Sequence, residues 1–585
     1  MKIKLNFTVF WPCLVLACLT SCSTASSKAG ALNRASLVDD VSPPPTRADD
    51  LVHSLTKLAS FGQKAVGSPA GYEAAKWILQ EMKDIGLEAA HFEEFAFPYN
   101  EYESSKLVLV SGKLQREIPF EILEGSGGTG GKTLNSALVW VNIGAPADFV
   151  GKDLTGKIAV LRRDVNYDRS IQLQNCIQAH AVAMLYVSQA PNNLRQVGTV
   201  RRTFEPSQAI PAISIGKDDG EAMIADLQAG KKITAAVRVQ VKMSPMNQPG
   251  HGRNVISKIT GEDPSRSIVI SAHYDTWFTG SSDNSSGISG LLALARRELA
   301  RVRLEGKKPR YTLVFAAFDG EEISLYGGYA YLRRHFFIPQ PDKILAAVNL
   351  EMPTGADKKS QEQFPEAAQS NWGLIYSQIP VISDAVKKIS SRNPEPLYPK
   401  LQGIDAVAKD SGGVIATDIQ PHYRAGIPTI CTWLDTPWYH TAKDDLEHID
   451  IDFLAKGVDF FGELLVELAA HDPVEFAAVD TSLLKATATV QPRRATSEDL
   501  TVTVAITDVS GKPVNDVPLQ VELHVNDFFP AWTESSGRLR TDRSGIVHFS
   551  IPASAANLAP NGRYLNITAG AKYPLVEAVV PVTGI

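Results

Sequence analysis

Histidines and acidic residues follow four apolar runs between residues 273 and 440. SIVISA is followed by His273 and Asp275, TLVFAAF by Asp319, Glu321 and Glu322, LAAVNL by Glu351, and PTICTWL, through DTPWY, by His440. If the four runs are strands of one sheet, their polar ends converge on one edge, and acids scattered at random over a surface would not do this. Imidazole and carboxylate without thiolate suit zinc, and also manganese or cobalt. The pattern therefore predicts a metal site.

The surplus of acids argues for a second metal ion. One zinc ion needs three protein ligands and a water molecule, which would leave Asp283, in SSDNSSG, and other acids without a role. Unpaired anions packed together would repel each other and raise each other's pKa. Two histidines with several acids can hold two ions that share a bridging carboxylate. We therefore predict two Zn²⁺ per chain, with Mn²⁺ or Co²⁺ as possible substitutes.

The elements that carry these residues indicate an α/β fold. SIVISAH, YTLVFAAFDGEE, ILAAVNLEM and IPTICTWL lack polar alternation, as strands do when helices cover both faces of a parallel sheet. SGISGLLALARRELARV has apolar residues on one helical face, and so does 71–86, which ends on Gly86. We predict a doubly wound, mostly parallel sheet, in which ligands bind outside the carboxyl ends of the strands.

The texture of the sequence changes twice outside this region. SALVWVNIG, GKIAVLRRD, AVAMLYVS and AIPAISIG predict short strands, so 101–245 is interpreted as a β-rich insertion into a domain formed by 51–100 and 246–475. From 480 to 585, alternating runs such as LTVTVAITD and VPLQVELHV, separated by turn sequences, predict an immunoglobulin-like β-sandwich.

The N-terminus predicts an exported protein. Two lysines precede an apolar stretch that is shorter than a membrane-spanning helix, and the stretch ends in LTSC at Cys22. This resembles a bacterial lipoprotein signal over 1–21, with Cys22 as the lipidated residue. Residues 22–50, which include a triple proline, would form a linker. Ser23 after the cysteine favours anchoring in the outer membrane, facing the periplasm or the surface.

Charge and cysteine content exclude other classes. A formal net charge of -6 gives no basic footprint, so we expect no nucleic-acid partner. Once the signal and Cys22 are set aside, only Cys176 and Cys431 remain, both in apolar surroundings. Their spacing asks for neither a disulfide nor a thiolate metal site, and we expect both to be buried packing residues.

Five motifs, in order, carry a resemblance to a known family. HYD, SSDNSSG, DGEE, NLEM and WYHTAKDD resemble the motifs of the co-catalytic zinc exopeptidases, which include bacterial leucine aminopeptidases and glutamate carboxypeptidase. The resemblance covers about 51–95 and 246–475. The segment with DLTGKIAVLRRD and IPAISIGKDDG resembles the protease-associated domain inserted at this place in that family. The resemblance implies a peptidase that acts on peptides or small proteins.

The family pattern implies a metal ligand set. His273 and Glu351 would bind one zinc ion, Glu322 and His440 would bind the other, and Asp283 would bridge them. In this family the residue at Glu351 is usually aspartate, so the longer side chain would shift that metal ion or weaken its binding.

The resemblance also implies catalytic roles. Glu321 would be the general base for a metal-bridging water. The hydroxyl of Tyr439 would support the tetrahedral oxyanion. Asp275 would fix the orientation and the tautomer of the His273 ring.

Several activities remain open at this stage, with an aminopeptidase favoured. A carboxypeptidase or dipeptidase of the same family would need a cation for the terminal carboxylate. No arginine or lysine lies between Gly426 and His440, although Arg424 lies nearby in the sequence. A glutaminyl cyclase would use one zinc ion, which the two histidines and Asp283 argue against. A non-catalytic, receptor-like binding protein would have lost ligands or the base, and here the set is complete.

Overall fold

The computed structural model describes residues 45–585 except for 104, 165–166, 201–208, 246, 339–341, 366–372, 393–396, 399, 411–414, 478–483, 526–527, 535, 559–562, 571–575 and 583–585. The predicted signal 1–21, the lipidation site Cys22 and most of the predicted linker 22–50 lie outside the described residues. Among the helices that are described, none combines the length and the apolar composition needed to span a bilayer.

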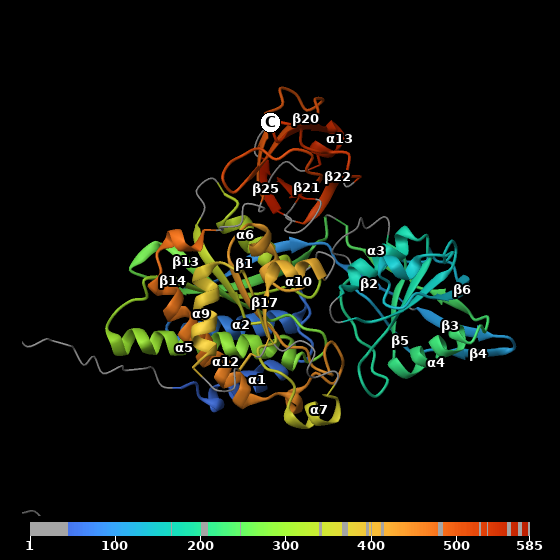
Figure 1. Cartoon of the computed structure of the whole chain (residues 1–585), viewed down its shortest axis with the longest axis horizontal. Helices are drawn as coiled ribbons and strands as arrows, with labels where there is room; N and C mark the ends of the chain where they lie inside the picture. The colour runs from blue at the N-terminus through green and yellow to red at the C-terminus, as the bar shows by residue number, and fades with distance from the viewer. Residues whose placement is uncertain are drawn as a thin grey trace, which may run out of the picture. The chain divides into compact units, whose positions relative to one another are not determined.

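An eight-stranded mixed sheet forms the core of the first part of the chain (Figure 1). Its strands, in spatial order, are β1 (Glu88–Phe97), β12 (Gly250–Ile259), β14 (Tyr311–Phe318), β13 (Asp263–His273), β15 (Lys343–Asn349), β18 (Thr429–Trp433), β16 (Gly373–Tyr376) and β17 (Lys400–Gly403). The neighbours β14, β13, β15 and β18 are parallel, and antiparallel pairs occur toward the edges. The predicted doubly wound, mostly parallel sheet is confirmed.

Apolar residues of β13 alternate between two hydrophobic clusters. Ile268 and Ile270 pack in one cluster with residues of α1 (Ala48–Ala59), α2 (Pro69–Ile85), α5 (Ser286–Glu305) and α12 (Ile451–Ala470). Val269 packs on the opposite face with residues of α6 (Tyr326–His335). Since both faces are covered, a strand without polar residues is what the fold requires.

Helix α2 was predicted from the sequence, and four shorter helices lie later in the chain. The predicted helix over 71–86 is α2, which ends at Gly86 in the left-handed conformation (φ 96°) that suits a glycine cap. The shorter helices are α7 (Lys358–Gln363), α9 (Pro380–Ser390), α10 (Ile404–Asp410) and α11 (Ile419–Arg424).

The insertion contains a second eight-stranded sheet. In spatial order it consists of β4 (Leu114–Glu117), β3 (Lys106–Ser111), β10 (Thr234–Arg238), β6 (Leu134–Trp140), β7 (Ile158–Arg162), β8 (Ala183–Val187), β9 (Ala212–Ile215) and β5 (Phe120–Ile122). The four predicted strands are β6 to β9. The chain enters and leaves this unit beside the short pair β2 (Asn100–Tyr102) and β11 (Val241–Met243).

Two helices of the insertion did not follow from the sequence. These are α3 (Arg169–Gln178) and α4 (Lys217–Gln228). The sequence of α3, RSIQLQNCIQ, has few apolar residues, and of these only Leu173 and Cys176 are fully buried. Its helical periodicity is therefore weak. Cys176 and Cys431 are both buried and carry free thiols, as expected.

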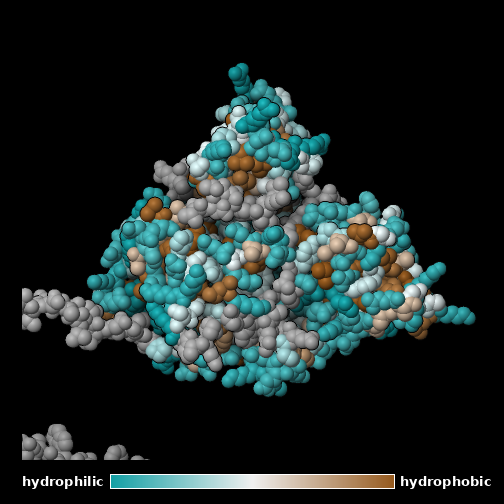
Figure 2. Space-filling model, in the orientation of Figure 1, coloured by the Kyte–Doolittle hydropathy of each residue, from teal (hydrophilic) through white to brown (hydrophobic). Residues whose placement is uncertain are grey.

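Among the described residues after 483, seven antiparallel strands form two sheets. One sheet contains β19 (Leu484–Val490), β20 (Leu500–Asp508) and β23 (Ile546–Ile551); the other contains β22 (Phe529–Glu534), β21 (Leu519–Val525), β24 (Arg563–Ala569) and β25 (Val576–Val582). Residues of both sheets share one apolar core, as in the predicted sandwich. On the face drawn in Figure 2 hydrophilic residues predominate, which agrees with the period-two alternation of these strands.

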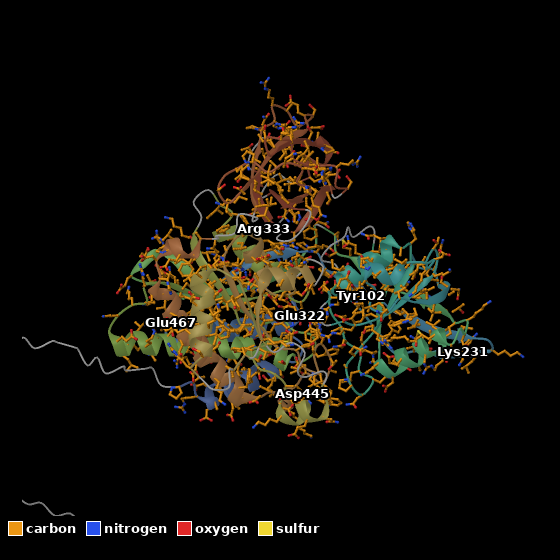
Figure 3. All side chains as sticks on the ribbon, in the orientation of Figure 1. Tyr102, Lys231, Glu322, Arg333, Asp445 and Glu467 are labelled. Carbon is orange, nitrogen blue, oxygen red and sulfur yellow. The ribbon has the colours of Figure 1, made fainter. Side chains whose placement is uncertain are left out.

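Arg333 of α6, labelled in Figure 3, contacts two residues from the C-terminal part of the chain. Its guanidinium lies 4.3 Å from the ring centroid of Phe528, and its Nη2 lies 3.3 Å from Nδ1 of His524. The contact buries a cation against an aromatic face, an arrangement that stabilises packing between elements.

Candidate metal centre

The carboxyl ends of four parallel strands deliver the residues that the sequence singled out. β13 ends at His273, β14 is followed by Glu321 and Glu322, β15 by Glu351, and β18 leads to His440. Asp283 comes from the loop before α5. Because the strands are parallel neighbours, these residues meet at one edge of the sheet. Glu322, labelled in Figure 3, is only 4% exposed.

Asp283 lies between the two histidines. Its Oδ1 is 3.1 Å from Nε2 of His273, and its Oδ2 is 2.9 Å from Nε2 of His440. Glu351 Oε1 lies 3.3 Å from the first nitrogen, and Glu322 Oε2 lies 3.2 Å from the second. The structure thus brings the five residues together as two groups of three donors that share Asp283.

The nitrogen and oxygen atoms of the two groups are suited to bind metal cations. Among the described residues, Glu322 Oε1 and Glu351 Oε2 are buried oxygens without a hydrogen-bond partner. A buried carboxylate oxygen without a partner is costly unless a cation compensates it. Imidazole nitrogens and carboxylate oxygens are ligands that zinc accepts. Glu351 reaches the group formed by His273 and Asp283, with its Oε1 3.3 Å from Nε2 of His273.

Each histidine uses its other ring nitrogen to bind a main-chain carbonyl. Nδ1 of His273 donates to the carbonyl of Asp275 (2.9 Å), and Nδ1 of His440 donates to the carbonyl of Val197 (3.0 Å). A carbonyl can only accept, so each Nδ1 carries a proton, and each Nε2 is the nitrogen that can bind either a second proton or a metal ion. Both rings are therefore set to coordinate a metal through Nε2.

Asp275 orients the His273 ring through its main-chain carbonyl, whereas its carboxylate oxygen lies 3.6 Å from Nδ1. The carboxylate instead accepts the main-chain N–H groups of Glu321 (3.1 Å) and Glu322 (3.2 Å). Asp275 thus holds the turn that presents both glutamates.

In the metal-free protein, the pKa values of His273, His440 and Glu351 favour their protonated forms. Burial disfavours the charged form of His440, but Glu322 and Asp283 outweigh it and raise the pKa of His440 to about 9. Burial likewise opposes the charge of His273, while Glu351 and Glu321 raise its pKa. Burial raises the pKa of Glu351 to about 8, although His273 opposes the shift.

Zinc binding to the metal-free protein should therefore release protons. A cation displaces the protons of the ligands, so near pH 7 we expect at least one proton per zinc ion, and fewer once the pH passes about 9. Apparent affinity should fall as the pH falls. Titration calorimetry in two buffers of different ionisation enthalpy measures the protons released. Zinc binding at pH 7 without proton release would contradict these protonation states.

Tyr439 and an unexpected arginine complete the cavity. The Tyr439 ring stacks on His440, with ring centroids 3.8 Å apart. The guanidinium of Arg169, from α3 of the insertion, hydrogen-bonds Tyr439, and its Nε donates to the carbonyl of Thr199 (3.1 Å). One cavity is lined by Arg169, Tyr439 and Glu321, by the candidate ligands Asp283, Glu322, Glu351 and His440, and by Met352, Ala416, Thr417 and Trp433.

Two further buried residues hold the loops of the centre. The carboxylate of Asp444 accepts the main-chain N–H groups of Ser282 (2.7 Å) and Asp283 (3.0 Å). Lys64 is fully buried and donates to the carbonyl of Thr279 (2.9 Å). Burial lowers the pKa of Lys64 to about 7, although Asp444 and Asp275 favour its charge. Asp444 lies in the motif WYHTAKDD, but neither residue was predicted to support the centre.

The sheet, the acid shared between two histidines and the adjacent glutamate are consistent with a zinc-dependent peptidase. Comparison with known sequences agrees. Residues 254–464 match the model of Peptidase family M28, and 129–223 match that of the PA domain. The chain is therefore a zinc-dependent peptidase, in which 254–464 is similar to peptidase family M28 and 129–223 is similar to the PA domain. The predicted family is confirmed.

Similar proteins carry peptidase names. The chain is 26% identical to Aminopeptidase YwaD of Bacillus subtilis (strain 168) over 445 residues, which cover 74% of this chain and 86% of the relative. It is 23% identical to the Glutamate carboxypeptidase 2 homolog of Caenorhabditis elegans, with 69% and 66% covered. A solved aminopeptidase from Aneurinibacillus sp. strain AM-1 is 25% identical, with a TM-score of 0.50 and 72% and 93% covered.

Proposed function

We propose that the chain is a di-zinc exopeptidase, and that it acts as an aminopeptidase on N-terminal peptide bonds. The observation that carries the proposal is the pair of donor groups that share Asp283. When bound, zinc polarises the peptide carbonyl and acidifies water.

The residues around the two donor groups supply the remaining functions. Glu321 lies in the cavity without belonging to either donor group, and its Oε2 is 3.9 Å from Nε2 of His273. Its carboxylate accepts a proton from the attacking water and passes it to the leaving amine. Tyr439, hydrogen-bonded by Arg169, donates its hydroxyl to the charge that develops on the carbonyl oxygen.

The aminopeptidase assignment is supported by the acidic cavity and by the names of relatives. Glu321, Glu351 and Asp283 line the cavity and would attract a free α-ammonium group. The chain covers 86% of Aminopeptidase YwaD and 93% of the Aneurinibacillus aminopeptidase, but 66% of the Glutamate carboxypeptidase 2 homolog.

A carboxypeptidase is the second candidate, because Arg169 places a guanidinium in the cavity. The absence of a cation between Gly426 and His440 had argued against carboxylate recognition, but Arg169 reaches the site from the insertion. A guanidinium can hold a terminal carboxylate through two hydrogen bonds.

A panel of one peptide sequence with free, N-acetylated or C-amidated ends separates the candidates. We expect the N-acetyl peptide to resist, the C-amide to be cleaved, and a chelator to abolish cleavage. The reverse order of the two blocked peptides would establish the carboxypeptidase. In that case Arg169→Met should raise KM for free carboxyl ends by about 30-fold or more. In an aminopeptidase the same change should act mainly on kcat, through Tyr439.

We also propose that Cys22 anchors the chain to a membrane, as the N-terminal sequence predicts. Two lysines, an apolar stretch and LTSC support this proposal. Replacing Cys22 by serine should move the protein from the membrane to the soluble fraction, measured by fractionation of cells. Unchanged retention in the membrane would refute the anchor.

A further inference from the structure

One half of the metal centre is supported by the inserted PA domain. The segment 196–199 of the insertion runs beside Tyr439 and His440. Val197 donates its N–H to the carbonyl of His440 (3.1 Å), and its own carbonyl accepts Nδ1 of the same histidine (3.0 Å). The side chain of Gln196 donates to the carbonyl of Tyr439 (3.1 Å).

The same segment also reaches the second ligand of this half. The hydroxyl of Thr199 donates to the main-chain carbonyl of Glu322. Thr199 is 1% exposed and Gln196 is 3% exposed, so water does not compete for these contacts. Segment 196–199 therefore contacts both His440 and Glu322. These two residues form one of the two proposed metal positions together with Asp283.

Segment 196–199 is itself fixed within the insertion. The Gln196 side-chain oxygen accepts from the hydroxyl of Ser188 (3.1 Å) and from the N–H of Gln189 (3.0 Å). Gly198 has a φ of +140°, and a Cβ there would lie 2.4 Å from Cζ of Arg169. The backbone at Gly198 is thus set by the guanidinium against which it packs.

An ion pair connects the insertion to the segment between β18 and His440. Arg163 Nη2 lies 2.9 Å from Asp435 Oδ2, and the two side chains are 12% and 5% exposed. The guanidinium of Arg163 also lies 5.0 Å from the ring centroid of Tyr439. A buried, hydrogen-bonded pair of this kind fixes relative position.

In the part of the chain that the structure describes, the hydrogen bonds that support the other half of the centre come from the catalytic domain. His273 is oriented by the carbonyl of Asp275, and the main-chain carbonyl of Glu351 accepts the hydroxyl of Thr432 (2.8 Å). Thr432 lies on β18, beside β15, which leads to Glu351. In each half, a threonine hydroxyl donates to the main-chain carbonyl of the glutamate. Thr199 of the insertion does so for Glu322, and Thr432 of the central sheet does so for Glu351.

We propose that segment 196–199 sets the metal affinity of the position formed by Asp283, Glu322 and His440, while the position formed by His273, Asp283 and Glu351 is independent of the insertion. Gln196, Val197 and Thr199 are positioning residues, because they act through His440 and Glu322. The PA domain is then a structural part of one metal position. The proposal rests on the di-zinc function proposed above.

The test compares Thr199→Val with Thr432→Val. Each removes one hydroxyl from a main-chain carbonyl of one glutamate ligand and keeps the shape of the side chain. The full-length protein is freed of metal and titrated with Zn²⁺ against a chromophoric chelator to obtain two dissociation constants. His440→Ala and His273→Ala assign each constant to its position.

We expect Thr199→Val to raise the dissociation constant of the His440 position by about 10-fold or more, and to leave the His273 position within about twofold. Thr432→Val should do the reverse. Gly198→Ala displaces the same segment and should act like Thr199→Val. If Thr199→Val does not fold, as circular dichroism of the metal-free protein would show, Gln196→Leu replaces it.

Two results would overturn the inference. One is that the variants in segment 196–199 leave both constants unchanged, and the other is that they weaken both positions equally. Binding of fewer than two zinc ions by the unchanged protein would instead refute the di-zinc function, so the two failures are distinguishable.

Discussion

Replacing Glu321 by glutamine is expected to leave two metal ions bound and to lower kcat by about two to four orders of magnitude. Glutamine keeps the shape of the side chain but cannot accept the proton of the attacking water. Glu321 belongs to neither donor group, so the ligands stay in place. Steady-state kinetics and metal analysis of the same preparation measure both effects.

Glu298→Gln is the matched control for this change. Glu298 is a buried glutamate of α5 that pairs with Arg301 (2.9 Å) and does not line the cavity. Its substitution tests the effect of placing a neutral amide in the interior, and kcat should stay close to that of the unchanged protein. Full activity of the Glu321→Gln variant would remove Glu321 from the mechanism.

Replacing Asp283 by asparagine should weaken both metal positions together, by about 100-fold or more at each. Loss of a residue that only orients a ligand already costs about 10- to 100-fold in metal affinity, and here a shared ligand loses its charge. Asp283 contacts both histidines, so no single position can escape the change. Metal content after dialysis, together with activity at increasing zinc concentration, measures the loss.

Asp319→Asn controls for the change of an acid to an amide in the same region. Asp319 is buried at the end of the strand that leads to Glu321, and it accepts the main-chain N–H of Arg253 (3.0 Å). Burial and Asp275 raise the pKa of Asp319 to about 8, so at pH 7 asparagine replaces a neutral acid. We expect normal metal content in this variant. Two tightly held ions in the Asp283→Asn variant would refute a bridging role.

The sequence was informative wherever an apolar strand ended close to a proposed ligand. His273, Glu322 and Glu351 could be placed at one edge because each lies at the end of a buried parallel strand or within four residues after it, and strand ends of this kind converge. The central sheet could be predicted for the same reason, since buried strands without polar alternation are a strong local signal.

Support from distant parts of the chain could not be predicted. The contact between Val197 and His440 joins positions 243 residues apart and uses a main-chain carbonyl, which leaves no mark in the residue types. Arg169 begins a helix with few apolar residues, and only the tertiary fold brings it to the cavity. The atom through which Asp275 orients His273 could not be predicted for a similar reason, because it is the main-chain carbonyl.

The most direct test of the account is anomalous diffraction at the zinc absorption edge from crystals grown with zinc. We predict two peaks, one on each side of the Asp283 carboxylate, with His273 and Glu351 beside one and Glu322 and His440 beside the other. A single peak in crystals with excess zinc, or two peaks that do not share Asp283, would contradict the di-zinc centre.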